Sequence, residues 1–136
     1  MISIADAASA YILAAERCEE QRPIQGDQIL FLLVPAVTNR AFAAELYIKA
    51  ISQRDGQMLR GHDLIKLFHG LAVERRNAIV QETRMQEVSF NSALEENANL
   101  FVEWRYLFEK NNIQVSWQFL QKLSLAVKAV FECVDA

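Results

Sequence analysis

Glycine and proline are scarce in this chain, which has four glycines and two prolines among 136 residues. So few turn-forming residues argue against a sheet with many tight turns and favour a few long helices. A chain of this length can bury a core of its own, so we expect a single domain over residues 1–136.

A long apolar run is also missing. The longest one, Ile29 to Val37, is much shorter than the roughly 20 residues that cross a bilayer. The first ten residues, MISIADAASA, lack the basic lead and the continuous apolar stretch of a secretory signal. We therefore expect a cytoplasmic protein that does not associate with membranes.

Metal-binding residues are few as well. Cys18 and Cys133 form neither a disulfide framework nor a metal-binding spacing. We expect two inert, partly buried thiols, with a disulfide between the terminal helices as the minor alternative. His62 and His69 are seven residues apart, which is roughly 10 Å along a helix axis, so one metal ion cannot bind both. The sequence predicts no metal site and no cofactor.

The net charge of −3 gives no overall signature of nucleic-acid binding, but the charge is unevenly distributed. Residues 39–84 hold eight basic and five acidic residues, a charge of +3, whereas residues 1–38 and 85–111 each carry −3. One interpretation is a solvated surface of mixed sign. The other is a locally positive surface that meets an anionic ligand or an acidic partner.

Helical periodicity and capping residues divide the first two thirds of the chain into four helices. Ser3 is expected to cap a helix that runs to about Glu20. One side of this helix is apolar, and its members are Ile4, Ala8, Tyr11, Ala15 and Cys18. Asp27 then caps a helix to about Gln53, in which Pro35 marks either a kink or the true first turn. Shorter helices are expected from about His62 to Leu71 and from about Val73 to Arg84.

Two further helices complete the chain. Ser89 is expected to cap the first, whose buried stripe continues to Phe108 through Phe90, Leu94, Asn97, Phe101 and Trp104. Ser116 is expected to start the second, with a stripe of Leu120, Leu123, Val127, Val130 and Val134. No strand pattern competes with these helices. The fold class is therefore all-α, an up-and-down helical bundle of about five to six helices.

Several polar residues occupy positions beside the apolar stripes. Glu45 adjoins the stripe formed by Ala41, Ala44, Ile48 and Ile51, and Lys49 is spaced to pair with it. Asn97 interrupts an aromatic stripe, and Arg105 and Glu109 lie one turn apart on the same stretch. The charged pairs are either exposed, worth about 0.3–0.5 kcal/mol each, or part of a shared and partly buried polar network.

The segment LRGHDLIKLFHGL contains both histidines of the chain. Gly61 turns the chain, and Asp63 is suited to the N-terminal end of the following helix. Because the loop before it leaves the Glu45 helix, we expect His62 to lie within hydrogen-bond reach of Glu45, Arg105 or Tyr106. His69 is expected against the core or at its edge.

Three segments, AFAAELYIKAI, GHDLIKLF and NANLFVEWRYLFE, resemble the HEPN domains in order and spacing, over about Asn39 to Lys110. The resemblance implies an α-helical up-and-down bundle, often a homodimer, in toxin–antitoxin or phage-defence systems or beside a nucleotidyltransferase. Many HEPN domains are metal-independent ribonucleases, with an arginine followed after four to six residues by a histidine. Neither histidine here has an arginine at that spacing, so no catalytic residue is carried over.

What the resemblance does carry over is a set of signature positions, namely Glu45, Lys49, His62, Asp63, Trp104, Arg105, Tyr106 and Glu109. The function we expect is a non-catalytic HEPN-like binding module with a homodimeric state. Its pocket for a nucleotide or RNA phosphate would be lined by Arg60, His62, Arg105 and Tyr106. Its partner would be a nucleotidyltransferase or an antitoxin. The alternatives are a ribonuclease with a rearranged site, using His62 as general acid or base, and a purely structural bundle.

Overall fold

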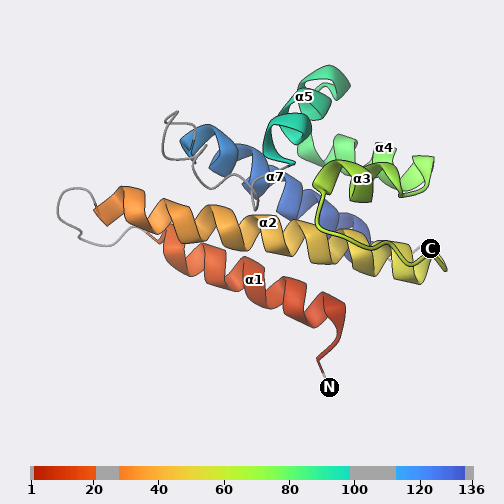
Figure 1. Cartoon of the computed structure of the whole chain (residues 1–136), viewed down its shortest axis with the longest axis horizontal. Helices are drawn as coiled ribbons and strands as arrows, with labels where there is room; N and C mark the ends of the chain where they lie inside the picture. Colours follow the sequence, from red (N-terminus) through yellow and green to blue (C-terminus); the bar gives the residue numbers. More distant parts are fainter. Residues whose placement is uncertain (1, 21–27, 99–112, 134–136) are drawn as a thin grey trace.

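The computed structural model describes residues 2–20, 28–98 and 113–133 (Figure 1). These residues form helices and no strand, which confirms the all-α prediction. The helices are α1 (Ile4–Glu19), α2 (Gln28–Arg54), α3 (Leu64–His69), α4 (Val73–Thr83), α5 (Glu87–Asn97) and α7 (Ile113–Glu132). No helix of the described part is long and apolar enough to cross a membrane.

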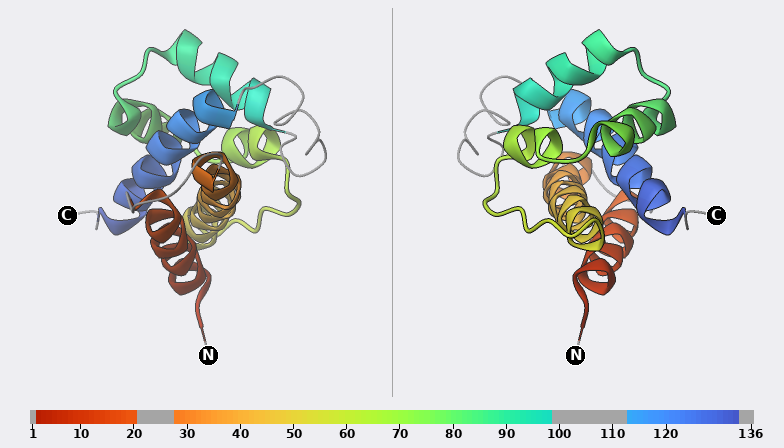
Figure 2. Two further views of the ribbon diagram at one scale, coloured as in Figure 1. Left: turned by 90° about the vertical axis from the view of Figure 1, so that its left-hand side faces the viewer. Right: turned by 90° about the vertical axis from the view of Figure 1, so that its right-hand side faces the viewer.

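The longest helix, α2, is the centre of the bundle. It packs along α1 on one side and along α7 on the other, and α1 runs antiparallel to it (Figure 1). The shorter helices α3, α4 and α5 form a second group, in which α4 packs on α7 and α3 contacts both α2 and α5 (Figure 2). This arrangement leaves α1 at the outer edge of the bundle.

Local capping explains where two of the helices begin. Ser3 caps α1 in a reciprocal capping box with Asp6, and Asp63 caps α3 through the backbone N–H groups of Ile65 and Lys66. The left-handed Arg84 ends α4, at the boundary that the sequence predicts. The capping signals of Ser3 and Asp63 are each contained in a few neighbouring residues, so the sequence alone was sufficient to place them.

Other helix boundaries differ from the prediction. Pro35 lies inside α2 rather than in its first turn, because the helix already begins at Gln28. Ser89 does not cap α5, which begins at Glu87, where an acidic first turn suits the helix dipole. Ser116 does not start α7 either; it lies inside the helix and is buried. Asp27, Phe101, Trp104, Phe108 and Val134 lie outside the described residues.

The predicted stripes form the core, with one shift. Most of the residues expected to be apolar and buried in α2, α5 and α7 are buried, namely Ala41, Ala44, Ile48, Ile51, Phe90, Leu94, Leu120, Leu123, Val127 and Val130. In α1 the buried residues are Ala8, Ile12 and Ala15. Tyr11, expected in that stripe, is exposed instead, and its ring lies against Phe42.

The cysteine prediction is confirmed only in part. Both thiols are free, so the alternative of a disulfide between the terminal helices is wrong. Cys18 is half-buried, and burial together with the nearby carboxylate of Glu19 raises the pKa of its thiol. Cys133 is exposed, contrary to the expectation of two partly buried thiols.

A buried ion pair joins α1, α2 and α7, and nothing in the sequence predicted it. The Arg40 guanidinium donates to both oxygens of Glu19, at 3.0 Å from Nε and 2.7 Å from Nη2. Its third nitrogen donates to the Ser124 hydroxyl, and Trp117 Nε1 donates to Glu19. The arginine is only 2% exposed, so its charge depends on Glu19 for compensation.

A second arginine–carboxylate pair ties the end of α2 to α4 and gives a prediction for pH. Arg75 donates to both carboxylate oxygens of Asp55, at 3.0 and 2.9 Å, and this bonding holds the pKa of Asp55 below its ordinary value. A lowered pKa stabilises the fold above the unfolded-state pKa of about 3.9, and the contribution is lost as pH falls through the folded-state pKa. We expect Asp55→Asn to lower the free energy of unfolding by about 1 kcal/mol at pH 7. Urea unfolding should show this difference disappearing in strong acid.

Candidate functional site

The site is built on a buried carboxylate in the middle of the bundle. Glu45 lies on α2 between Ala44 and Ile48, and its side chain is only 4% exposed. Lys49, one turn along the helix, places Nζ 3.4 Å from Glu45 Oε2. The other oxygen, Oε1, lies 2.9 Å from Nδ1 of His62. Each carboxylate oxygen therefore has a cationic or potentially cationic partner, in the partly buried network that was one of the two predicted alternatives.

The loop between α2 and α3 brings His62 to this carboxylate. Leu59 packs closely over Gly70, where a Cβ would lie 2.7 Å from the leucine Cδ2. Gly61 then adopts a φ of +96°, a left-handed conformation that other residues rarely take, one residue before His62. Asp63 accepts from the backbone N–H of Ile65 at 2.9 Å and starts α3. The predicted geometry, with His62 beside Glu45 and Asp63 capping its own helix, is confirmed.

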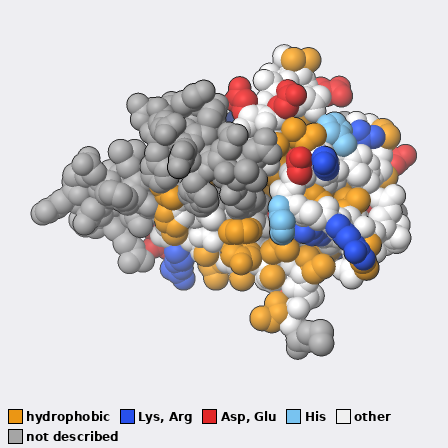
Figure 3. Space-filling model, viewed as in Figure 1, with side chains coloured by type: hydrophobic (Ala, Val, Ile, Leu, Met, Phe, Trp, Pro, Cys, Tyr) orange, Lys and Arg blue, Asp and Glu red, His pale blue; other side chains and the backbone are white. Residues whose placement is uncertain are grey.

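The ring of His62 is held by Glu45 at Nδ1, while the rest of the side chain is open to solvent. Its side chain is 76% exposed although Nδ1 lies against the buried carboxylate. When Nδ1–H donates to Glu45, Nε2 is the nitrogen left for a ligand. A neutral ring then offers an acceptor or a base at Nε2, and a protonated ring offers a donor. Histidine and basic side chains lie near one another on this face (Figure 3).

The remaining predicted residues divide into three groups. Arg60 is exposed and two residues from His62, close enough along the chain to contribute to the same site. Asn97 is buried, and its Nδ2 donates to the backbone oxygen of Ala93 in its own helix, so its recorded bond is local. Arg105, Tyr106 and Glu109 lie outside the described residues.

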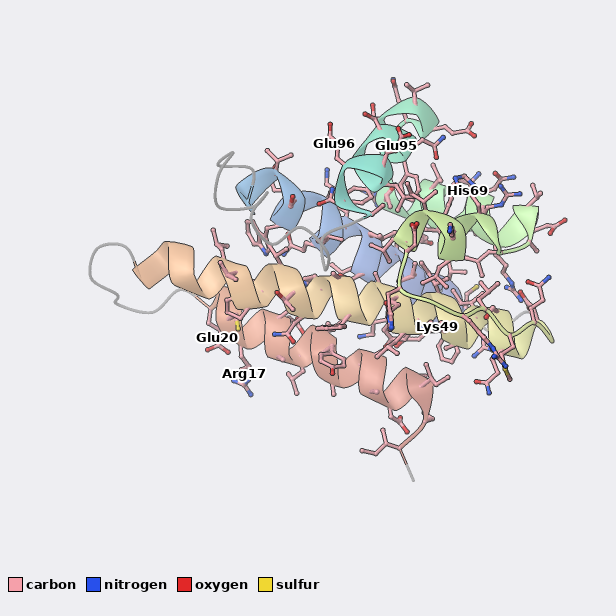
Figure 4. All side chains as sticks on the ribbon, in the orientation of Figure 1. Arg17, Glu20, Lys49, His69, Glu95 and Glu96 are labelled. Carbon is pink, nitrogen blue, oxygen red and sulfur yellow. The ribbon has the colours of Figure 1, made fainter. Side chains whose placement is uncertain are left out.

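His69 differs from His62 in its surroundings. It lies at the end of α3, is exposed, and has its ring edge-on to that of Phe68 at 5.5 Å between centroids (Figure 4). The expected place at the edge of the core is consistent with this contact. Because no carboxylate contact is recorded for it among the described residues, His69 serves as a matched control for His62.

The described part of the chain contains no cluster of metal ligands. No group of three or more His, Cys, Asp or Glu side chains there could hold a metal ion. A pocket of about 510 Å³ does lie next to the Asp55–Arg75 pair, with Glu74 and Glu82 also lining it. No pattern in the sequence indicates this pocket, because α4 and α7 form it together and are distant in the chain.

Comparisons with protein-family models, with curated proteins and with solved structures find no match for this chain.

Proposed function

We propose that this chain is a non-catalytic, HEPN-like binding module that holds an anionic group, a nucleotide or RNA phosphate, at His62. The observation that carries the proposal is the contact between His62 and Glu45. An exposed histidine whose Nδ1 is 2.9 Å from a buried carboxylate presents Nε2 in a fixed direction. A fixed donor forms a charge-assisted bond to phosphate with little loss of side-chain freedom.

Basic residues around His62 support an anionic ligand. Arg60 lies two residues before it and is exposed, and Lys66 lies on the first turn of α3 and is also exposed. Lys49 is held beside the same carboxylate as His62 by its ion pair with Glu45. Arginine offers planar paired donors to phosphate and lysine offers a point charge, so the three residues favour the same class of ligand. Arg105 and Tyr106 complete the proposed binding set.

The biological setting of this module is proposed from its resemblance to the HEPN domains. A homodimer in a defence or toxin–antitoxin-type system would place the module beside a nucleotidyltransferase or an antitoxin as its partner. A gene for either of these next to the gene for this chain would support the binding module over a purely structural bundle.

Binding is tested with fluorescein-labelled single-stranded RNA, followed by fluorescence anisotropy at several salt concentrations. His62→Gln removes one charge-assisted bond and is expected to weaken binding about tenfold. His69→Gln is expected to leave the affinity unchanged, because that ring has no recorded carboxylate partner. Affinity should fall with rising salt, since binding to phosphate releases counterions. Equal affinities of the two variants would refute the assignment of His62.

One observation favours a second candidate function, that of a ribonuclease. A histidine oriented by a carboxylate through one nitrogen can act as a base through the other. His62 Nε2 would take the proton of a ribose 2′-hydroxyl and the 2′-oxygen would attack phosphorus. The bond from phosphorus to the 5′-oxygen would break, and the departing 5′-oxygen would take a proton from water. Arg60 or Arg105 would stabilise the charge that develops on the phosphate.

The binding proposal predicts no cleavage. Purified protein incubated with structured RNA in EDTA should leave the RNA intact, as judged on a denaturing gel. Cleavage that persists in His69→Gln and disappears in His62→Ala would refute the binding proposal and favour the ribonuclease function.

A further inference from the structure

The outward face of α1 carries an apolar centre with a charge of opposite sign at each end. Asp6, Ala10, Leu13 and Arg17 follow one another at intervals of four, three and four residues, so they form one stripe along the helix. All four are exposed, and Leu13 is 55% exposed. Arg17 extends away from α2 (Figure 4). The stripe therefore faces away from the bundle, at its outer edge.

Small side chains leave a hollow beside this stripe. A groove of about 600 Å³ runs along α1, with Ala7, Ala10 and Ala14 lining it and Tyr11 at its side. Alanines permit the close approach of a second helix, as larger side chains do not. An exposed leucine beside a groove lined by alanine allows the leucine of one copy to enter the groove of another.

The stripe is complementary to itself when it is reversed. In an antiparallel pair of α1 helices, Asp6 of one copy faces the partner's Arg17, and Ala10 faces the partner's Leu13. Both pairings follow from one register, because the residue numbers of each facing pair add to the same value. Asp6 and Arg17 are about 16 Å apart along the helix, so two charge pairs would flank a central apolar contact.

We infer that this face of α1 is the interface between two copies of the chain, related by a two-fold axis that crosses the helix between Tyr11 and Ile12. This inference rests on the homodimeric state proposed above and specifies the surface that forms it. A two-fold interface must present the same patch from both subunits, and the reversed stripe meets that requirement. The apolar centre supplies contact area, and the end charges fix the antiparallel register.

The local bonds of the two charged residues are compatible with this pairing. Asp6 Oδ2 accepts from the Ser3 backbone N–H at 3.2 Å, and a carboxylate has a second oxygen. Arg17 Nη1 donates to Glu20 Oε1 at 3.0 Å, and a guanidinium has five N–H donors. Both local bonds are exposed, so each can coexist with a further partner or exchange for one.

The test is sedimentation velocity over a series of protein concentrations, without RNA, so that failure here is independent of failure at His62. Leu13→Glu is expected to raise the dissociation constant of the dimer at least tenfold. Val88→Glu changes a residue that is 80% exposed on α5 and should leave association unchanged. Circular dichroism shows whether each variant is folded.

Charge reversal tests the register itself. Asp6→Lys and Arg17→Glu each place like charges opposite one another and should weaken the dimer severalfold. The double variant Asp6→Lys with Arg17→Glu restores opposite charges at both ends, so it should associate more tightly than either single variant. A wild-type chain that stays monomeric at hundreds of micromolar, or a double variant no tighter than the singles, would overturn the inference.

Discussion

Arg40→Met is expected to lower the free energy of unfolding by about 3–5 kcal/mol, the largest effect of any single substitution considered. The substitution leaves the Glu19 carboxylate in the interface of three helices with Trp117 Nε1 as its remaining recorded partner. Such a group keeps most of its desolvation cost and loses the charge that compensated it. Urea unfolding followed by circular dichroism measures the change.

An exposed ion pair provides the control for Arg40. Lys128 and Glu132 pair at 3.9 Å one turn apart on α7, where Glu132 is exposed and Lys128 is partly exposed. Lys128→Ala should therefore change the free energy of unfolding by less than about 0.5 kcal/mol. If Arg40→Met were as mild as Lys128→Ala, the buried pair would have no structural role.

Glu45→Leu is expected to separate stability from binding. Lys49 is partly exposed and His62 is mostly exposed, so both can turn to water when the carboxylate is removed. Replacing a buried carboxylate by an apolar side chain of similar size should then change the free energy of unfolding by no more than about 1 kcal/mol. The ring of His62 loses its orientation, however, and RNA affinity should fall about tenfold.

The direction of the change in RNA affinity distinguishes a loss of His62 orientation from a general effect of removing one negative charge. Glu82→Leu removes one negative charge from an exposed position on α4, which should leave RNA affinity unchanged or raise it slightly. Glu45→Leu removes the same charge and should lower the affinity. Tighter RNA binding in Glu45→Leu would mean that this carboxylate opposes the ligand rather than positions His62.

The parts of the fold that the sequence predicted depend on neighbouring residues. Ser3 and Asp63 each bond to backbone groups within three residues, so their capping role can be read locally. The Glu45–His62 contact was predictable for a related reason. A short connection follows the helix of Glu45, which keeps the start of α3 near it.

The parts that were missed depend on how one helix is rotated against another. Ser116 has the composition of a helix cap, but α7 extends past it and buries it in the bundle. Arg40 and Glu19 are 21 residues apart on different helices, so no spacing rule connects them. In α1, Ile12 is buried in place of Tyr11, a rotation that only packing against α2 determines.

The central claim, that Glu45 holds the His62 ring so that Nε2 receives an anionic ligand, is tested most directly by nitrogen NMR of ¹⁵N-histidine-labelled protein. The chain contains only His62 and His69, so the spectrum holds one test ring and one control ring. At alkaline pH we predict that the neutral His62 ring carries its proton on Nδ1 and none on Nε2. In acid, where the ring is protonated and Nε2–H can donate to phosphate, single-stranded RNA should shift the Nε2 resonance of His62 but not that of His69. A proton on Nε2 of the neutral His62 ring, with equal responses of the two rings to RNA, would contradict the claim.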